Sequence, residues 1–179
     1  MRNERMKKVI ITGLCIAIGL LLPRVINVIP VPYPGAIFLP MHIPVIICGF
    51  VCGKYFGTIC GAVLPLLAFV LTGMPPIFPT GISMVVELAT YGFLSAWLYE
   101  LTKGRIIISL IIAMVGGRVV MGIANIILFN FTDNIYGISI FISSAFITAF
   151  PGIIIQFILI PIIIEALKKA SMMTLPNER

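Results

Sequence analysis

The chain has 179 residues, of which 60% are hydrophobic and 10% are charged, and its mean hydropathy is +1.19. Soluble domains carry about 25% charged residues. A soluble fold of this length cannot hide so much apolar surface, so the composition excludes a soluble globular protein and predicts an integral membrane protein.

Six hydrophobic segments are long enough to cross a bilayer as helices, each of which needs about 20 mostly apolar residues. In chain order, we predict membrane spans at about residues 8–29, 36–53, 57–73, 78–100, 105–130 and 138–167. Runs such as R-I-I-I-S-L-I-I-A-M-V do not alternate apolar and polar residues as barrel strands do. We therefore expect an all-α integral membrane protein with six transmembrane helices, organised as one domain over residues 1–179 with no soluble domain.

The basic residues are distributed unevenly between the two sides of this arrangement. With six spans both termini share a side, and ten of the twelve basic residues fall there: Arg2, Arg5, Lys7, Lys8, Lys54, Lys103, Arg105, Lys168, Lys169 and Arg179. Arg24 is the basic residue of the opposite loops, and Arg118 lies inside a span. The positive-inside rule then predicts cytoplasmic termini and a multi-pass protein of the bacterial cytoplasmic membrane. A net charge of +6 distributed in this way argues against a nucleic-acid partner.

The first hydrophobic segment follows basic residues, as in a secretory signal peptide, but no convincing small-residue cleavage site follows it. We treat it as the first span. Two pairs of small residues lie four positions apart in it, Gly13 with Ala17 and Cys15 with Gly19. Such faces let helices approach closely, either inside the protein or against an external partner.

The four cysteines lie in predicted spans or near the cytoplasmic face, where disulfides are rare. Cys48 and Cys52 share a helical face, but a zinc site needs four ligands and the single histidine belongs near the opposite face. We expect the cysteines to be small packing residues and the protein to use no metal or other cofactor.

Two loops on the outer side are rich in proline. Residues 23–40 contain five prolines and residues 72–81 contain three. Proline stiffens a loop and ends helices abruptly. The loops either form ordered lids over an outward-facing pocket or simply end the helices at the interface.

Glu87 and Arg118 lie near the middle of their predicted spans. Each costs about 2.5–3.5 kcal/mol at the centre of a membrane helix, so both should face the protein interior and be paired. They form a structural ion pair, line a polar cavity that holds a ligand, or do both.

Motifs of self-sufficient enzymes and pumps are missing from the sequence. It contains no G-x-x-x-x-G-K-[ST] phosphate loop, no H-E-x-x-H and no G-x-S-x-G. With six acidic residues and one histidine, few acid–base sites can be built, so we predict that the protein is not an enzyme. The duplicated halves of many carriers are also missing. We expect a membrane-embedded binding protein without its own energy source, with a solitary permease or channel as the alternative.

Several stretches resemble the substrate-binding S components of energy-coupling factor (ECF) transporters: T-G-L-C-I-A-I-G-L-L-L-P, F-L-P-M-H-I-P-V-I-I-C-G-F-V-C-G, the segment from L-T-G-M-P-P to E-L-A-T-Y-G, and G-G-R-V-V-M-G. The resemblance covers nearly the whole chain. It implies a high-affinity binding subunit for a small water-soluble vitamin or vitamin precursor. It also implies three partners that provide energy, a transmembrane coupling subunit and two ATPase subunits.

The resemblance also suggests roles for particular segments. The A-x-x-x-A face of the first helix, which docks on the coupling subunit in this family, corresponds to Gly13 and Ala17. The loops at residues 30–40 and 72–80 would cover the ligand near the outer side. By resemblance, the loaded protein topples in the membrane and releases its ligand to the cytoplasm.

His42 stands between Pro40 and Pro44, close to the start of the second span. Proline is tolerated there because the first backbone donors of a helix have no intrahelical partner. His42 either braces the lid or contacts the ligand as a neutral hydrogen-bonding group.

Aromatic side chains near the pocket offer surfaces for a heterocycle, among them Tyr33 and Phe78, whereas Trp97 lies too near the cytoplasm. The complete set of expected binding residues is His42, Glu87, Arg118, Tyr91, Phe38, Met74 and Asn125. Pantothenate, α-ribazole and a B6-type vitamer are the candidate ligands. If Glu87 neutralises Arg118 fully, a neutral heterocycle or nucleoside becomes a better ligand than an anion.

Overall fold

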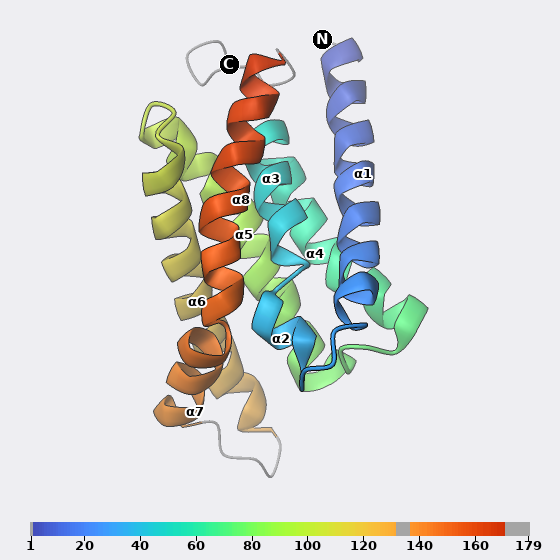
Figure 1. Cartoon of the computed structure of the whole chain (residues 1–179), viewed down its shortest axis with the longest axis vertical. Coiled ribbons are helices and arrows are strands. Elements are labelled where there is room, and N and C mark those ends of the chain that lie inside the picture. Colours follow the sequence, from blue (N-terminus) through green and yellow to red (C-terminus); the bar gives the residue numbers. More distant parts are fainter. Residues whose placement is uncertain (1, 132–136, 171–179) are drawn as a thin grey trace.

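The computed structural model describes residues 2–131 and 137–170, and these residues form helices and connecting loops without any strand (Figure 1). The elements are α1 (Arg2–Ile26), α2 (Pro34–Phe38), α3 (His42–Cys52), α4 (Lys54–Thr72), a π-helix η1 (Ile77–Gly81), α5 (Ile82–Leu101), α6 (Ile106–Phe129), α7 (Ile138–Ile142), a second π-helix η2 (Ser143–Thr148) and α8 (Phe150–Lys169). The beginning of α1 and the end of α8 lie at the same end of the molecule (Figure 1).

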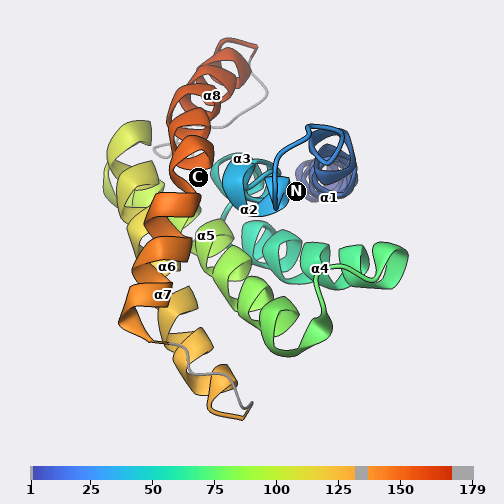
Figure 2. The ribbon, with the colours of Figure 1, turned by 60° about the horizontal axis from the view of Figure 1, so that its bottom comes forward.

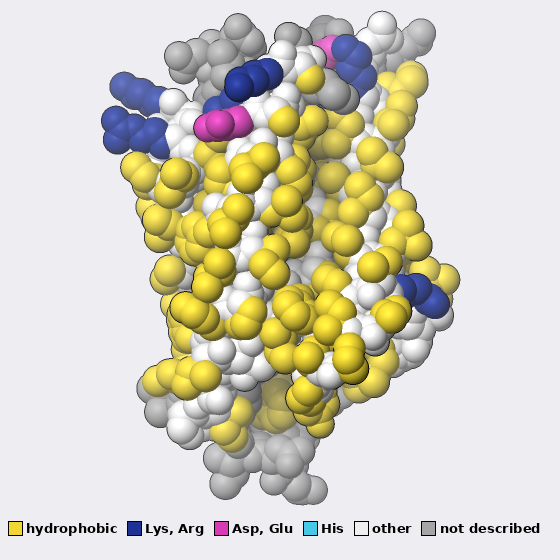
Figure 3. Space-filling view, viewed as in Figure 1, with side chains coloured by type: hydrophobic (Ala, Val, Ile, Leu, Met, Phe, Trp, Pro, Cys, Tyr) yellow, Lys and Arg dark blue, Asp and Glu magenta, His cyan; other side chains and the backbone are white. Residues whose placement is uncertain are grey.

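Six helical segments of the described chain are long and apolar enough to cross a membrane. They run over Asn3–Ile26, Pro34–Cys52, Lys54–Thr72, Ile77–Leu101, Ile106–Phe129 and Phe150–Lys169. Hydrophobic side chains cover the middle of the surface, while Lys and Arg side chains gather mainly at the end where α1 begins and α8 ends (Figure 3). An apolar exterior of this kind suits a lipid environment, so the predicted all-α membrane fold is confirmed.

Helix α3 lies at the centre of the bundle, surrounded by α1, α4, α5 and α8 (Figure 2). Two thirds (67%) of the membrane window that contains α3 is buried, compared with 17% of the α1 window. The most central helix is thus also the one that begins with the single histidine, and α1 is a peripheral helix that packs mainly on α3 and α4.

Helices α3 and α4 are separated by one residue, Gly53, whose φ of 94° is a backbone conformation that L side chains rarely adopt. This break lets α3 and α4 form a hairpin. The next helix, α5, then packs on both of them.

Glycines allow the backbones of α3, α4 and α5 to touch. A Cβ on Gly49 would lie 2.5 Å from the carbonyl oxygen of Gly92, and Cβ atoms on Gly57 and Gly92 would overlap each other's backbone. Small residues at such contacts are the usual basis of close helix packing in membranes. The three helices therefore form a closely packed unit on which the polar interior is built.

Two predicted spans are interrupted in the structure. The span expected at 36–53 consists of α2 and α3, because Leu39 adopts a left-handed conformation (φ 50°) and the chain turns before His42. The span expected at 138–167 consists of α7, η2 and α8, with Pro151 in the first turn of α8. The 20 residues of α8 span a bilayer core on their own, so α7 and η2 are an addition at the end opposite the chain termini (Figure 1).

Candidate functional site

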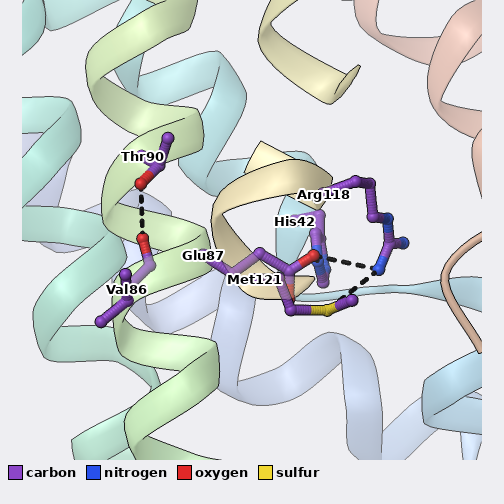
Figure 4. A network of polar contacts seen from close by, with 6 residues as sticks. All are labelled: His42, Val86, Glu87, Thr90, Arg118 and Met121. Carbon is purple, nitrogen blue, oxygen red and sulfur yellow. Dashed lines mark hydrogen bonds and ion pairs between the residues drawn. The ribbon is translucent and has the colours of Figure 1, made fainter. Parts of the chain in front are cut away.

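Three charged or titratable side chains from three helices meet in the interior (Figure 4). Nη1 of Arg118 on α6 lies 3.0 Å from Oε1 of Glu87 on α5, and Nε2 of His42 on α3 lies 3.4 Å from the same oxygen. The side chains are 6%, 3% and 4% exposed, respectively. The Arg118 contact is an ion pair, whereas the His42 contact is one only when the imidazole is protonated. Neither is an aligned hydrogen bond, because Oε1 has no hydrogen-bond partner of suitable angle within the described residues.

Tyr91 packs beside this cluster. Its ring meets the His42 ring edge to face, with centroids 5.2 Å apart. On its other side the Tyr91 ring fills the space left by Gly117 on α6, where a Cβ would lie 2.5 Å from Cε1 of the ring. The G-G-R sequence thus gives α6 a glycine that admits Tyr91 and, at the next position, the arginine that reaches Glu87.

Arg118 uses only part of its guanidinium within the protein. Nη1 contacts Glu87 and also donates to Sδ of Met121 at 3.7 Å. Nε and Nη2 are buried and have no hydrogen-bond partner in the described part of the chain.

Other buried polar atoms of the interior also lack a hydrogen-bond partner among the described residues. They are Nδ1 of His42, Oγ of Ser83 and Nε2 of Gln156. Buried polar groups are normally hydrogen-bonded, because an unpaired one costs about 1–3 kcal/mol. This concentration of unpaired groups, most of them donors, is typical of a binding site rather than of a packed core.

Ser83 lies on a helix of the cluster, and Gln156 lies on α8, which contacts α3. Ser83 lies one turn before Glu87 on α5. Gln156 lies one turn after Gly152, and Gly152 packs against the backbone of Ile37 and Phe38 at the end of α2. Because α8 contacts α3, Gln156 and His42 lie on neighbouring helices.

Ser83 and Gln156 are not among the site residues expected from the sequence, and Gly117 enters there only within the G-G-R-V-V-M-G stretch, without a role of its own. The sequence does contain a signal for Gln156, because an amide within the run I-I-I-Q-F-I-L-I must face the protein interior. Ser83 and Gly117 have no such signal, since serine and glycine are common in any membrane helix.

The expected binding residues have different positions. His42, Glu87 and Arg118 form the cluster and Tyr91 packs beside it, while Asn125 is buried about two turns beyond Arg118 on α6. Phe38 is half-buried at the end of α2. The structure does not bring Met74 to the cluster, because its side chain is 65% exposed in the loop after α4.

The remaining aromatic residues considered from the sequence lie outside the cluster. Tyr33 and Phe78 are exposed, in the two proline-rich loops. Trp97 is exposed on α5 and stacks on Phe93 with centroids 6.1 Å apart. None of the three makes an aromatic contact with the ring of His42 or Tyr91 in the described part of the chain.

Two segments lie over the end of the polar interior that is opposite the chain termini (Figure 1). One is α2, which is flanked by the left-handed residues Tyr33 and Leu39 and rests on Gly152 of α8. The other is the loop that leads into η1, with cis peptide bonds before Pro75 and Pro79. These are the two proline-rich loops identified in the sequence.

The two small-residue pairs of α1 face in different directions. Cys15 and Gly19 are buried, and a Cβ on Gly19 would lie 3.2 Å from the Pro44 ring. Gly13 and Ala17 are exposed, and nothing lies within 4 Å of a Cβ built on Gly13. The first pair packs α1 onto the bundle, and the second forms an open face of small residues.

The cysteines are free and buried, and two of them connect α3 to α1. Sγ of Cys48 donates to Oγ1 of Thr12 at 3.6 Å, and Sγ of Cys52 donates to the carbonyl oxygen of Lys8 at 3.7 Å. Within the described residues, no three His, Cys, Asp or Glu side chains are arranged to hold a metal ion. The thiols therefore act as weak donors between the two helices.

A surface depression of about 300 Å³ lies elsewhere, lined by Ser139, Ile140, Ser143, Ser144 and Thr148 of α7 and η2. It includes no member of the charged cluster. We assign the candidate site to the buried cluster, because the unpaired polar groups are there.

Comparison with known proteins agrees with this architecture. A family model described as "ECF transporter, substrate-specific component" matches residues 7–164. Neither the curated proteins nor the solved structures provide a match to the chain. With six apolar helices around a buried polar cluster, and a family match over most of its length, the chain belongs to the substrate-specific components of ECF transporters.

Proposed function

We propose that this protein captures a small water-soluble vitamin or vitamin precursor in the interior around His42, Glu87 and Arg118. The observation that supports this most is the group of buried, unpaired polar atoms on His42, Arg118, Ser83 and Gln156. A membrane protein that only had to fold would gain stability by replacing them with apolar side chains. A ligand with complementary polar groups would give them partners.

The charges favour an orientation with both termini in the cytoplasm. Lys and Arg side chains gather mainly at the end of the molecule that contains the start of α1 and the end of α8 (Figure 3). In the bacterial cytoplasmic membrane, α2 and the loop before η1 then face outwards. In this orientation α2 and that loop cover the site, and the ligand enters from the outside.

Energy comes from partner proteins in this proposal. The sequence has no phosphate loop, so the chain does not hydrolyse ATP through one. A transmembrane coupling subunit and two ATPase subunits provide the energy. The coupling subunit docks on the open face of α1 formed by Gly13 and Ala17, where small side chains allow close helix contact.

The experiment that tests this function has two parts. The full chain is purified from native membranes, and any small molecule that co-purifies is identified by mass spectrometry. Uptake of that molecule is then measured in cells or liposomes with and without the ECF module. We expect one vitamin-like compound in near-stoichiometric amount and uptake only with the module.

Other results would contradict the proposal. Flux through liposomes that contain this chain alone would identify a solitary permease or channel. Release of a chemically altered ligand would identify an enzyme. A protein that co-purifies with no compound and that no water-soluble vitamin stabilises against heat would also contradict it.

A further inference from the structure

The unused edge of Arg118 restricts the chemistry of the ligand. A guanidinium has five N–H donors in a fixed planar arrangement, and the N–H groups of Nε and Nη2 point in the same direction along one edge. Glu87 and Met121 contact Nη1, whereas Nε and Nη2 are buried without a hydrogen-bond partner within the described residues, so this two-donor edge is unpaired. A planar group with two parallel acceptors complements such an edge, and a carboxylate does so with two charge-assisted hydrogen bonds.

The charge of the site places a condition on such a ligand. Glu87 and Arg118 already neutralise each other. A second carboxylate would leave one net negative charge in an apolar interior, and a buried charge without compensation is strongly disfavoured. A carboxylate therefore needs one further positive charge within the cluster.

His42 can provide that charge. Its Nε2 lies 3.4 Å from Oε1 of Glu87, and its Nδ1 is buried without a partner among the described residues. Imidazole is the side chain that gains a proton between pH 5 and 8, and both ring nitrogens then donate. Nε2 would donate to Glu87, and Nδ1 would be a further donor in the site.

The other groups around His42 do not supply the charge. The titratable groups that face it are Glu87 and Tyr91 from α5, with Arg118 behind Glu87 on α6. The described parts of α1, α4 and α8 place no acidic or basic side chain within ion-pair distance of His42. Gln156 of α8, a helix that contacts α3, does not titrate.

We propose that the ligand carries a carboxylate, which binds to the Nε–Nη2 edge of Arg118, and that His42 takes up one proton from water when the ligand binds. The new N–H bond is at Nδ1 when Nε2 already carries its hydrogen. The loaded site then contains two carboxylates, one guanidinium and one imidazolium and is neutral overall. This inference rests on the proposed function and narrows its substrate class.

The test uses three matched pairs of an acid and an uncharged analogue: pantothenate with pantothenol, nicotinate with nicotinamide, and biotin with biotinamide. Binding to the purified full chain is measured by thermal shift and by calorimetry. We expect at least one acid to bind, with its uncharged analogue about 100-fold weaker because two charge-assisted hydrogen bonds are lost. Equal binding within each pair, or binding by none of the acids, overturns the proposal.

Variants of Arg118 test the edge itself. Arg118→Lys keeps a positive charge for Glu87 but removes the parallel donors, so the preference for the acid should fall at least tenfold. The single variant Arg118→Gln would leave the Glu87 carboxylate unpaired and can unfold the protein. The double variant Glu87→Gln/Arg118→Gln is therefore used in its place to remove the guanidinium. Arg24→Gln, a change at an exposed arginine of the outer half, is the matched control and should bind as the natural protein does. A preference for the acid that survives in Arg118→Lys contradicts the assignment.

The pH dependence tests the proton. Affinity for the acid should fall towards tenfold per pH unit on the alkaline side, because one proton binds with each ligand. His42→Gln should weaken binding and remove this dependence. Affinity that does not change between pH 6 and 8.5 overturns the role of His42.

Failure of this inference can be told apart from failure of the proposed function. If an uncharged compound co-purifies and is imported with the ECF module, the proposed function stands and the carboxylate inference fails. Absence of uptake with the module contradicts the function itself.

Discussion

Glu87 and Arg118 connect α5 and α6 through an ion pair in which Oε1 and Nη1 are 3.0 Å apart, and both side chains are almost fully buried. The same oxygen lies 3.4 Å from His42 of α3. One carboxylate thus connects three helices at the polar centre of a bundle whose outer surface is apolar. Its loss should affect the stability of the fold as well as ligand binding.

Removing one partner of this pair should destabilise the protein strongly. Glu87→Gln leaves the Arg118 charge uncompensated, and breaking a buried ion pair in this way typically costs about 3–5 kcal/mol. The double variant Glu87→Gln/Arg118→Gln leaves no charge and should recover part of the loss. Thermal or denaturant unfolding in detergent gives the stability of the natural protein, the single variant and the double variant.

Glu4→Gln, which removes the exposed pair with Lys7, is the control and should change stability little. Equal stability of the natural protein and Glu87→Gln would contradict a structural role.

Gly92→Ala should destabilise the contact between α4 and α5. A Cβ at this position overlaps the carbonyl of Gly57, so the helices must move apart. Forcing extra atoms into a packed interior typically costs about 1–3 kcal/mol. Gly13→Ala is the matched control, because its Cβ meets nothing within 4 Å and alanine favours a helix by about 0.5–1 kcal/mol. The free energy of unfolding should therefore fall for Gly92→Ala and rise for Gly13→Ala. A shift in the same direction for both variants would contradict this account of the packing.

Gln156→Leu should raise stability and lower affinity. Nε2 of Gln156 is buried without a partner, so an apolar side chain of similar size removes a cost of about 1–3 kcal/mol. A ligand that bonds to this amide would lose that contact, with an affinity loss of about tenfold. Thermal unfolding and ligand titration measure the two effects.

Ser109→Ala provides the comparison for Gln156→Leu. The Ser109 hydroxyl is paired with Thr102 at 2.7 Å and with the Arg105 carbonyl at 2.8 Å, near the start of α6. Its loss should lower stability without changing affinity. If Gln156→Leu binds the ligand as the natural protein does, the amide is not a ligand contact.

Bulky residues on the open face of α1 should stop transport without affecting binding. Gly13→Leu and Ala17→Leu point away from the bundle, so the site and the fold should tolerate them. The docking that we propose on this face would require small side chains at these positions, and we expect uptake to fall at least tenfold. Ala166→Leu places the same bulk on an exposed position of α8 and is the control. Normal uptake by the α1 variants would show that docking occurs elsewhere.

Gly152→Ala should loosen α2 over the site. The added Cβ would lie 2.6 Å from the carbonyl oxygen of Ile37, so α2 must lift from α8. If α2 acts as a lid, ligand dissociation should accelerate by about tenfold, corresponding to about 1.4 kcal/mol of overpacking. Gly35→Ala changes α2 itself at a position where a Cβ meets nothing within 4 Å, and it is the control. Unchanged dissociation from Gly152→Ala would contradict the lid role.

Much of the fold follows from the composition of the sequence and from the turn residues and charges that separate its hydrophobic segments. A chain with 60% hydrophobic residues has to place them against lipid, and runs of about 20 apolar residues without alternation form helices there. Glu87 and Arg118 could be assigned to the interior for the same reason, because lipid cannot solvate a charge. The interruption after Phe38 cannot be predicted from the local sequence, since it depends on a left-handed turn at Leu39 that leucine does not favour by itself.

Other features were decided by the tertiary structure alone. Gly13 with Ala17 and Cys15 with Gly19 have the same four-residue spacing, yet one pair is open and the other is buried against α3 and α4. The spacing defines a face but not the rotation of the helix about its axis, and in lipid both faces of α1 are apolar. In the same way, the sequence places Arg118 in the interior, but the position of Glu87 decides which edge of its guanidinium stays unpaired. Helix rotation and side-chain direction result from packing between segments far apart in the chain, so local sequence patterns do not determine them.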